Sequence, residues 1–270
     1  MKNNRLIAQI GLIFVTIIWG VTFVLVKEAL KDAPPFSFAA FRFGLATILT
    51  ILLIHRRLFQ LNKIELIGGV ICGFFLFSGY AFQNFGLIHT TASKSAFITS
   101  VSVLMVPFLL MLFKIQTVST RIWTAVFLAT VGLYLLILPG GNGLNQGDIL
   151  TFGCAISFAV HIIMQDIYIK KGVRLLHFFC VQSGFITLFS LLNAQIVESA
   201  PINWSYPLCI AIIITGVLGT FAAFLMMIWA QKILNPSETA IIFSIEPLAA
   251  ALFATMFGGE ILGIWGWVGV

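Results

Sequence analysis

The sequence predicts an all-α polytopic membrane protein with ten transmembrane helices, the tenth incomplete, arranged as two inverted five-helix repeats. Three observations support this fold class. Hydrophobic residues make up 60% of the chain and charged residues only 9%, whereas about a quarter of the residues in a soluble domain are charged. Long apolar runs alternate with short polar breaks along the whole chain. A short motif also recurs in the second half, at a corresponding place between two runs.

Nine apolar runs are long enough to be membrane spans, because a bilayer core of about 30 Å needs about 20 helical residues. They cover residues 7–27, 35–54, 65–87, 93–113, 121–138, 148–169, 174–196, 207–231 and 237–258. We expect the first run to remain as a span rather than to be cleaved as a signal peptide, since no A-x-A site follows it. Residues 261–270 are about half a crossing, and we expect them to begin a tenth span that continues beyond this sequence.

Basic residues in the short loops predict the orientation of the chain. If the N-terminus is cytoplasmic, the outside segments hold only Lys27, Lys31 and Lys94. The inside segments then hold eleven basic residues: Lys2, Arg5, Arg56, Arg57, Lys63, Lys114, Arg121, Lys170, Lys171, Arg174 and Lys232. This asymmetry follows the positive-inside rule, so we expect a cytoplasmic N-terminus in a multi-pass protein of the plasma (inner) membrane. The net charge of +6 then reflects topology and not a nucleic-acid surface.

A repeated motif divides the chain into two halves. The segment Leu87–Ala96 (LIHTTASKSA) resembles Gln231–Ala240 (QKILNPSETA), and each joins the end of one long run to the start of the next. The glycine-rich stretch 139–147 lies between the halves and is expected to be a linker, with the repeats at 1–138 and 148–270. Because five helices form each repeat, the second repeat must have the opposite orientation, as in many secondary transporters.

Five short motifs, in order along the chain, carry a family resemblance. They are Trp19-Gly20, Arg42 within Ala39–Gly44 (AAFRFG), Gly86–Lys94 (GLIHTTASK), Glu246-Pro247 and Gly259-Glu260. Together they resemble the EamA-like family of the drug/metabolite transporter superfamily, over essentially the whole chain. The resemblance implies a ten-helix basket with alternating access for small metabolites, in which spans one to four and six to nine line a central cavity. The sequence departs from the pattern in its incomplete tenth span and at Ser157–His161 (SFAVH), where the second half lacks a Trp-Gly pair.

Arg42 lies inside the second expected span, where a charge is costly and therefore indicates a function or a specific partner. One interpretation is a counter-charge for an anionic substrate group such as a carboxylate, which a guanidinium binds bidentately. The other is a structural role, in which Arg42 pairs with Glu246 or with backbone carbonyls at a broken helix. The sequence leaves both interpretations open.

Glu246 precedes Pro247 in the ninth expected span. Proline removes one helical hydrogen bond, so Pro247 is expected to break the helix and to create a polar place for the carboxyl group. Since a low dielectric favours the neutral form of a carboxyl group, Glu246 is a candidate for proton coupling. The alternative is a structural partner of Arg42 or of the helix kink.

The sixth expected span carries a polar stripe of Ser157, His161 and Gln165, spaced four residues apart and therefore on one helical face. Such a stripe in a membrane helix faces protein or a water-filled cavity. His161 and Gln165 are candidate substrate contacts, and the alternative is that they bind neighbouring helices.

Three further residues are candidate substrate contacts. Trp19 could stack on a planar or cationic substrate, and Gln83 could line the cavity from the third span. Lys94 heads the fourth span, where it either adds a positive charge at the cavity mouth or extends to the membrane surface.

The sequence thus predicts a secondary active transporter that moves a small metabolite, namely an amino acid or a related zwitterion or anion. A cationic drug exporter is the alternative, because Glu246 and aromatic rings would suit a cation. The sequence contains no P-loop, H-E-x-x-H or G-x-S-x-G motif, so direct ATP drive and a membrane enzyme are disfavoured; an assembly protein is a further alternative. We expect no cofactor and no metal, since the four cysteines are isolated inside spans. The expected partners are a small-molecule substrate, the lipid bilayer, protons or an exchange substrate, and a second copy in a homodimer, with no nucleic acid.

Overall fold

The computed structural model describes residues 2–113, 124, 127, 128, 131, 132, 135 and 144–269. Within these residues, eight helical segments are long and apolar enough to cross a membrane. Six of the eight consist of one unbroken helix: α1 (Lys2–Ala29), α2 (Pro35–Ile54), α3 (Lys63–His89), α4 (Ala92–Leu112), α6 (Gln146–Lys170) and α7 (Leu175–Val197). A 3-10 turn, η1 (His55–Gln60), follows α2. The expected span 121–138, with Lys114 and Arg121, lies mostly outside the described residues.

The remaining two spans are interrupted helices. The expected span 207–231 consists of α8 (Tyr206–Ile213), a π-helical segment η2 (Ile214–Ala222) and α9 (Ala223–Gln231). The expected span 237–258 consists of α10 (Pro236–Phe243) and α11 (Glu246–Met256), separated by a turn at residues 244–245. This break falls directly before Glu246-Pro247, as the proline predicted. A short helix, α12 (Ile264–Gly269), begins three residues after the expected start of the tenth span.

Three helices begin with the same local device, an asparagine N-cap and an acidic residue three positions later. Each side chain accepts a hydrogen bond from the other residue's backbone N–H, which satisfies donors that a helix start leaves unpaired. The pairs are Asn62 with Glu65 in α3, Asn145 with Asp148 in α6, and Asn235 with Glu238 in α10. Because Asn145 caps α6, Gln146 and Gly147 belong to the first helical turn. Helix α6 thus begins within the stretch 139–147 that is expected to link the halves.

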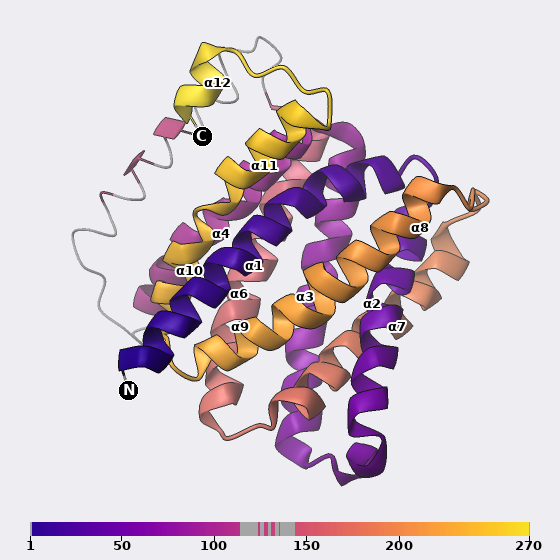
Figure 1. Ribbon diagram of the computed structural model, residues 1–270, viewed down its shortest axis with the longest axis vertical. Coiled ribbons are helices and arrows are strands. Elements are labelled where there is room, and N and C mark those ends of the chain that lie inside the picture. The colour runs from indigo at the N-terminus through magenta and orange to yellow at the C-terminus, as the bar shows by residue number, and fades with distance from the viewer. Residues whose placement is uncertain are drawn as a thin grey trace.

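The spans run alternately up and down, so that their ends gather on two sides of the bundle (Figure 1). The Glu260 end comprises the connections at residues 30–34, 90–91, 198–205 and 257–263. The Arg174 end comprises the connections at 55–62, 171–174 and 232–235, together with the start of α1. Contacts between distant segments join each side, for example Asn203 with Asp32 at the Glu260 end and Arg174 with Glu65 at the Arg174 end.

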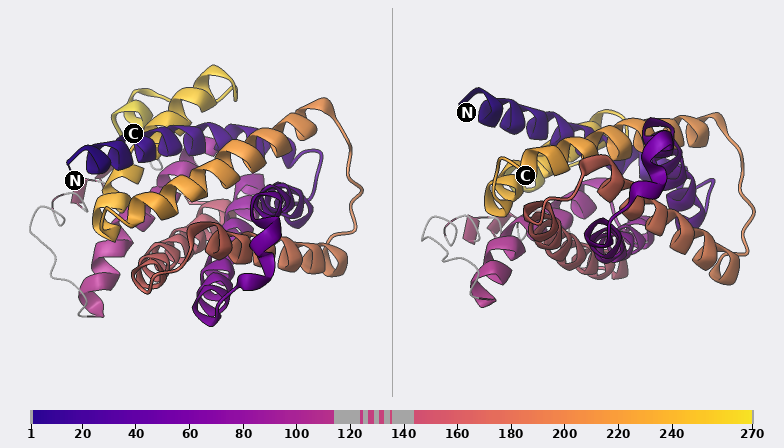
Figure 2. Two further views of the ribbon diagram at one scale, coloured as in Figure 1. Left: turned by 60° about the horizontal axis from the view of Figure 1, so that its bottom comes forward. Right: turned by 90° about the horizontal axis from the view of Figure 1, so that it is seen from below.

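Two groups of helices surround the centre of the bundle. Helix α1 packs along α9 and α11, whereas α3 packs against α6 and α7, and α2 against α7 (Figures 1 and 2). Large apolar side chains such as Phe14, Leu52, Phe74, Leu191 and Ile196 cover the outside, as a lipid-facing surface requires. Polar side chains such as those of Arg42, Gln83, His161, Gln165 and Glu246 lie inside. These mid-span polar residues therefore face the interior of the protein.

Candidate functional site

A small cavity lies midway between the two ends, where α1, α3, α4, α6, α9 and α10 meet the first residue of α11. Aromatic rings form much of its wall: Trp19, Phe23, Tyr80, Phe158, Phe224 and Phe243. Its polar lining consists of Thr22, Gln83, Thr99, Ser102, His161 and Glu246. The volume is about 50 Å³, which leaves room for only a few water molecules. The candidate site is thus a small cavity with a largely aromatic wall.

Glu246 is the only residue with a carboxyl group in this lining. The break between α10 and α11 makes it the first residue of α11, so its carboxyl group lies beside the N-terminal end of a helix dipole in mid-bundle. Only 8% of Glu246 is exposed, and its carboxyl group has no hydrogen bond or ion pair with any described residue. This acid is therefore available to a ligand or a proton.

Arg42 lies behind the cavity wall and binds the π-helical segment. Its Nε donates to Thr220 Oγ1 at 2.7 Å, and its Nη2 donates to Tyr80 Oη at 3.2 Å and to the Gly219 carbonyl at 3.4 Å. The guanidinium also lies over the Tyr80 ring, 4.6 Å from its centre. It makes no ion pair with Glu246, so the pairing that the sequence suggested as one structural role is wrong. The contact with a backbone carbonyl at an irregular helix, the other suggestion, is present.

Trp19 shares the same carbonyl. Its Nε1 donates to Gly219 O at 2.8 Å, while its ring packs edge-on against Phe243 at 5.0 Å between centres. A π-helical turn is wider than an α-helical turn and is frequent at functional sites. Here it presents one carbonyl to both Trp19 and Arg42, so α1 and α2 are tied to one point of η2.

The polar stripe on α6 divides between the cavity and the helices around it. His161 lines the cavity, and its Nε2 donates to Gln182 Oε1 on α7 at 3.0 Å. Ser157 donates back to its own helix, to Gly153 O. Gln165 is fully buried one turn beyond the cavity, and its Nε2 donates to Gln231 Oε1 at 2.7 Å.

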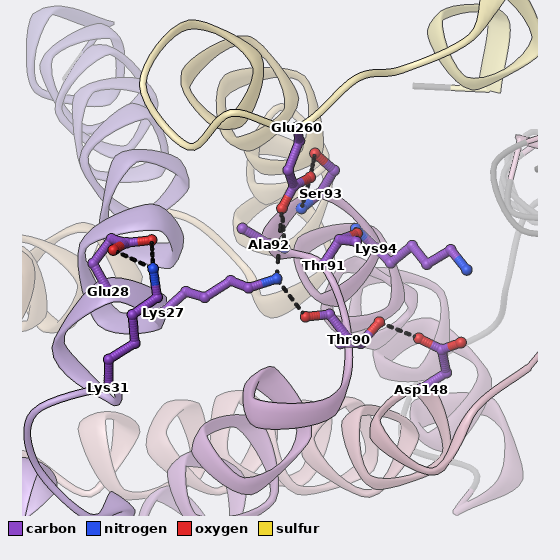
Figure 3. A network of polar contacts seen from close by, with 10 residues as sticks. All are labelled: Lys27, Glu28, Lys31, Thr90, Thr91, Ala92, Ser93, Lys94, Asp148 and Glu260. Atoms are coloured by element: carbon purple, nitrogen blue, oxygen red, sulfur yellow. Dashed lines mark hydrogen bonds and ion pairs between the residues drawn. The ribbon is translucent and has the colours of Figure 1, made fainter.

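Lys94 does not reach the cavity. In Figure 3 its side chain leaves the start of α4 in the direction away from Lys27 and Glu260. Lys27 occupies the inner position instead, donating to the Thr90 carbonyl at 2.7 Å, with Glu260 Oε1 3.9 Å from its Nζ. The expectation that Lys94 adds a charge at the cavity mouth is therefore not met. The Lys94 side chain therefore points outward from the first turn of α4.

Glu260 closes the same end of the bundle by capping α4 (Figure 3). Its carboxylate accepts from the backbone N–H of Ala92 at 2.6 Å, from that of Ser93 at 3.3 Å and from Ser93 Oγ at 2.6 Å. Gly259, with φ of +65°, makes the left-handed turn that ends α11 and directs Glu260 across to α4. Three chain segments thus meet at this end of the bundle: the end of α1, the start of α4 and the segment after α11.

The sequence model of the EamA-like transporter family matches residues 6–138 and 145–270, which is nearly the whole chain. The chain belongs to the EamA-like transporter family. An "Uncharacterized transporter" of Archaeoglobus fulgidus is 33% identical over 259 residues, which are 96% of this chain and 80% of the relative. The "Uncharacterized transporter YoaV" of Bacillus subtilis is 24% identical over 91% of this chain and 86% of its own length. A solved structure described as "Crystal structure of protein" has a TM-score of 0.73 at 15% identity, covers 97% of this chain and 92% of its own, and so shares the fold.

In this EamA-like transporter, the structure brings together four of the residues predicted from the sequence: Trp19, Gln83, His161 and Glu246 all line the cavity. Arg42 and Gln165 are buried behind the lining, and Lys94 lies outside it. Pro247 follows the helix break as the second residue of α11.

Sequence reasoning missed several residues that shape the site of this EamA-like transporter. They are Tyr80, Thr220, Gly219, Gln231 and Lys27. A signal for the π-helical segment exists in the sequence, because Ile214–Ala222 contains two glycines and two threonines in an otherwise apolar span. For Lys27 and Gln231 the signal is weak, since both lie at span ends, where polar residues are ordinary.

Proposed function

We propose that this chain is a secondary transporter that binds a small metabolite with an ammonium group, such as an amino acid or a related zwitterion, in the central cavity. The observation that carries this proposal is the position of Glu246, an unpaired acid facing an aromatic cavity. A carboxylate attracts an ammonium group directly, and aromatic faces attract a cation through their quadrupoles. Gln83, Thr99 and Ser102 supply hydrogen-bonding groups for the rest of the molecule.

The contacts of Arg42 favour a substrate with a positive group over a purely anionic one. Its guanidinium is already hydrogen-bonded to Thr220, Tyr80 and Gly219, and it does not line the cavity. Lys94 does not line the cavity either. Neither of the positive charges that suggested an anionic substrate therefore faces the cavity in this conformation.

Alternating access would account for the small size of the cavity. An amino acid has about ten non-hydrogen atoms and needs far more space than about 50 Å³. Contacts join the helices on both sides of the cavity, since Glu260 caps α4 at one end and Gln165 binds Gln231 at the other. In the proposed cycle the substrate enters when one of these contacts opens.

Two inverted repeats of five helices, at 1–138 and 148–270, are the architecture we propose for this cycle. Two matches to one family model, at 6–138 and 145–270, support this division. Helices at the same position in the two repeats also have equivalent neighbours. The first helix of the first repeat, α1, packs on α10 and α11, which form the fourth span of the second repeat. The first helix of the second repeat, α6, packs in the same way on α4, the fourth span of the first repeat. We place the N-terminus and the Arg174 end in the cytoplasm of a cell with a plasma (inner) membrane, because that end carries most of the basic residues.

Glu246 would also couple transport to protons. An unpaired carboxylate in the membrane interior is costly, so the acid is expected to hold either a proton or the substrate's ammonium group. Because the two compete for one carboxylate, movement of a cationic group in one direction would accompany movement of a proton in the other.

Counterflow in proteoliposomes tests the proposal. The panel would contain labelled amino acids, nucleosides and cationic dyes, and the protein would be checked for folding by size-exclusion chromatography. We expect accumulation of an ammonium-bearing compound by the native protein and clearly reduced accumulation in Glu246→Gln. The matched control is Glu28→Gln, because Glu28 is a half-exposed acid at the end of α1 that pairs with Lys31. Accumulation of purely anionic compounds, unaffected by Glu246→Gln, would contradict the proposal.

A cationic drug exporter is the second candidate, because the same aromatic wall with one acid would suit a lipophilic cation. The cationic dyes in the panel separate the two. Counterflow of dyes without counterflow of amino acids would favour the exporter.

A further inference from the structure

Two hollows lie one above the other along α6, α9 and α10. The central cavity is lined by residues of all three helices, among them His161, Met227 and Phe243. A second hollow of about 310 Å³ opens at the Arg174 end, where Asp166, Gln231 and Asn235 are among its lining residues.

Only one helical turn separates the two hollows. Gln165 and Gln231 follow His161 and Met227 by four residues, and Thr239 precedes Phe243 by four in a helix of opposite direction. Since residues four apart lie above one another, these three side chains form the layer between the cavity and the outer hollow. The name Gln165 layer is used below for Gln165, Gln231 and Thr239.

The Gln165 layer is polar, and its hydrogen bonding is incomplete. Gln165 Nε2 donates to Gln231 Oε1 at 2.7 Å. Gln165 Oε1, Gln231 Nε2 and Thr239 Oγ1 have no partner among the described residues, although these residues are 0%, 3% and 0% exposed. If the amide oxygen and nitrogen were exchanged in both Gln165 and Gln231, the pair would still have one acceptor and one donor without a partner. Buried polar atoms in folded proteins nearly always have partners, so three in one layer point to a ligand.

The chemistry of the open atoms identifies the ligand class. An amide oxygen accepts, an amide nitrogen donates and a hydroxyl does both, which is the combination that a water molecule satisfies with three or four bonds. A metal ion would require acceptors only, and Gln231 Nε2 is a donor.

We propose that the Gln165 layer binds ordered water and is the polar gate through which water and protons pass between the central cavity and the Arg174 end. Asp166 extends this polar route outward, because its Oδ1 is also buried without a described partner while its Oδ2 accepts from Lys170 Nζ at 2.6 Å. The role of this gate in the protein rests on the proposed transport function. It would let the proton of Glu246 exchange with one side while larger molecules are held back.

A small thiol-reactive cation tests for this route. In the full chain with Cys72, Cys154, Cys180 and Cys209 replaced by alanine, Ser102→Cys would place one reporter thiol in the cavity wall. Ag⁺ would be applied to vesicles with the Arg174 end facing the bath, and unreacted thiol would be counted with a fluorophore after denaturation. We expect Gln165→Leu with Gln231→Leu to slow the reaction by at least about tenfold, since two leucines dehydrate the layer.

The matched control is Gln165→Asn with Gln231→Asn, which keeps amide groups in the layer and is expected to react within about threefold of the native pair. The reaction from the Glu260 end should stay unchanged in both variants. A faster reaction there would mean that the leucines had shifted the conformation, and would overturn the interpretation. Equal rates for the leucine and native pairs from the Arg174 end would also overturn the proposal.

A second measurement covers the case in which the leucine pair fails to fold. Thr239→Val removes one open hydroxyl from the Gln165 layer without changing the shape of the side chain, so the reaction of the reporter with Ag⁺ from the Arg174 end should slow by about threefold. An unchanged rate in Thr239→Val would overturn the proposal. Neither measurement needs a transported substrate, so a failure here is distinguishable from a failure of counterflow.

Discussion

Arg42 on α2 and Thr220 on η2 are 178 positions apart in the sequence, and their side chains form a buried hydrogen bond of 2.7 Å. This contact joins the two halves of the chain beside the central cavity. It also gives the membrane-buried guanidinium a partner that does not require a substrate. The functional residues of this transporter can accordingly be separated into those that hold the site together and those that face a ligand.

Arg42→Gln is expected to lower stability more than substrate affinity. The change leaves Thr220 and Tyr80 without the guanidinium donor, and each buried unsatisfied group costs about 1–3 kcal/mol, whereas the Gly219 carbonyl keeps its bond from Trp19. Arg42→Lys should also be destabilising, because an ammonium group cannot reproduce the planar fork. Thermal unfolding in detergent would measure the loss, and KM from transport assays would show little change. A raised KM at unchanged thermal stability would instead make Arg42 a substrate ligand.

Glu246→Gln is expected to remove the dependence of transport on a pH gradient while exchange of substrate for substrate continues at a reduced rate. The amide has the shape of the protonated acid but cannot release a proton. Uptake into proteoliposomes with and without an imposed gradient would measure the effect. The gradient should still drive transport in Glu28→Gln, and a gradient that still drives Glu246→Gln would exclude this acid from coupling.

Glu260→Gln is expected to loosen the Glu260 end. The substitution removes the charge that faces Lys27. It also replaces the charge-assisted hydrogen bonds to Ala92 and Ser93 with neutral ones that are about half as strong. The Ser102→Cys reporter should then react faster with an impermeant thiol reagent applied at that end.

Glu198 provides the matched control for this prediction. It caps α2 with the same pattern, accepting from Phe36 N at 2.6 Å, Ser37 N at 2.9 Å and Ser37 Oγ at 2.7 Å. Because α2 and α7 also pack along their lengths, Glu198→Gln should leave the reporter's reactivity nearly unchanged. Equal acceleration by both variants would mean that neither carboxylate has a particular role in closure.

Gly20→Ala is expected to destabilise the contact between α1 and α11. A Cβ atom there would lie 2.6 Å from Ala249 Cβ and 2.8 Å from the Ala250 backbone nitrogen, so the helices must separate at a cost of about 1–3 kcal/mol. Gly184→Ala on α7 is the comparison, since its Cβ would meet only Thr47 Cγ2 at 3.8 Å. The thermal unfolding temperature should fall for Gly20→Ala and should stay level or rise for Gly184→Ala. Unchanged stability of Gly20→Ala would show that α1 and α11 are not held this closely.

Much of the fold could be predicted from the sequence, because long apolar runs identify membrane-spanning helices by their composition alone. Eight of the nine complete spans expected from apolar runs are present within a few residues of their predicted bounds, and the ninth lies mostly outside the described residues. The break before Pro247 was also predictable, because proline has no N–H to donate. The π-helical segment had only the signal of two glycines and two threonines in an apolar span, and its contacts with Arg42 and Trp19 come from other helices.

The candidate site was predicted in part. Trp19, Gln83, His161 and Glu246 share the cavity as expected, because polar or amphipathic groups in mid-span have no favourable place in lipid. The expectation that Lys94 adds a charge at the cavity mouth was not met, because a residue at a helix start can point outward as readily as inward.

By itself, the sequence determined that this protein is a membrane protein of many spans, where those spans begin and end, and to which family its motifs are similar. These properties follow from the cost of placing polar groups in hydrocarbon, which acts on each residue locally. Only the tertiary structure decided that Arg42 binds Thr220 and not Glu246, that Glu246 faces the cavity without a partner, and that Gln165 meets Gln231. Such choices depend on which helices pack together, and hydropathy does not specify which face of a helix meets which neighbour.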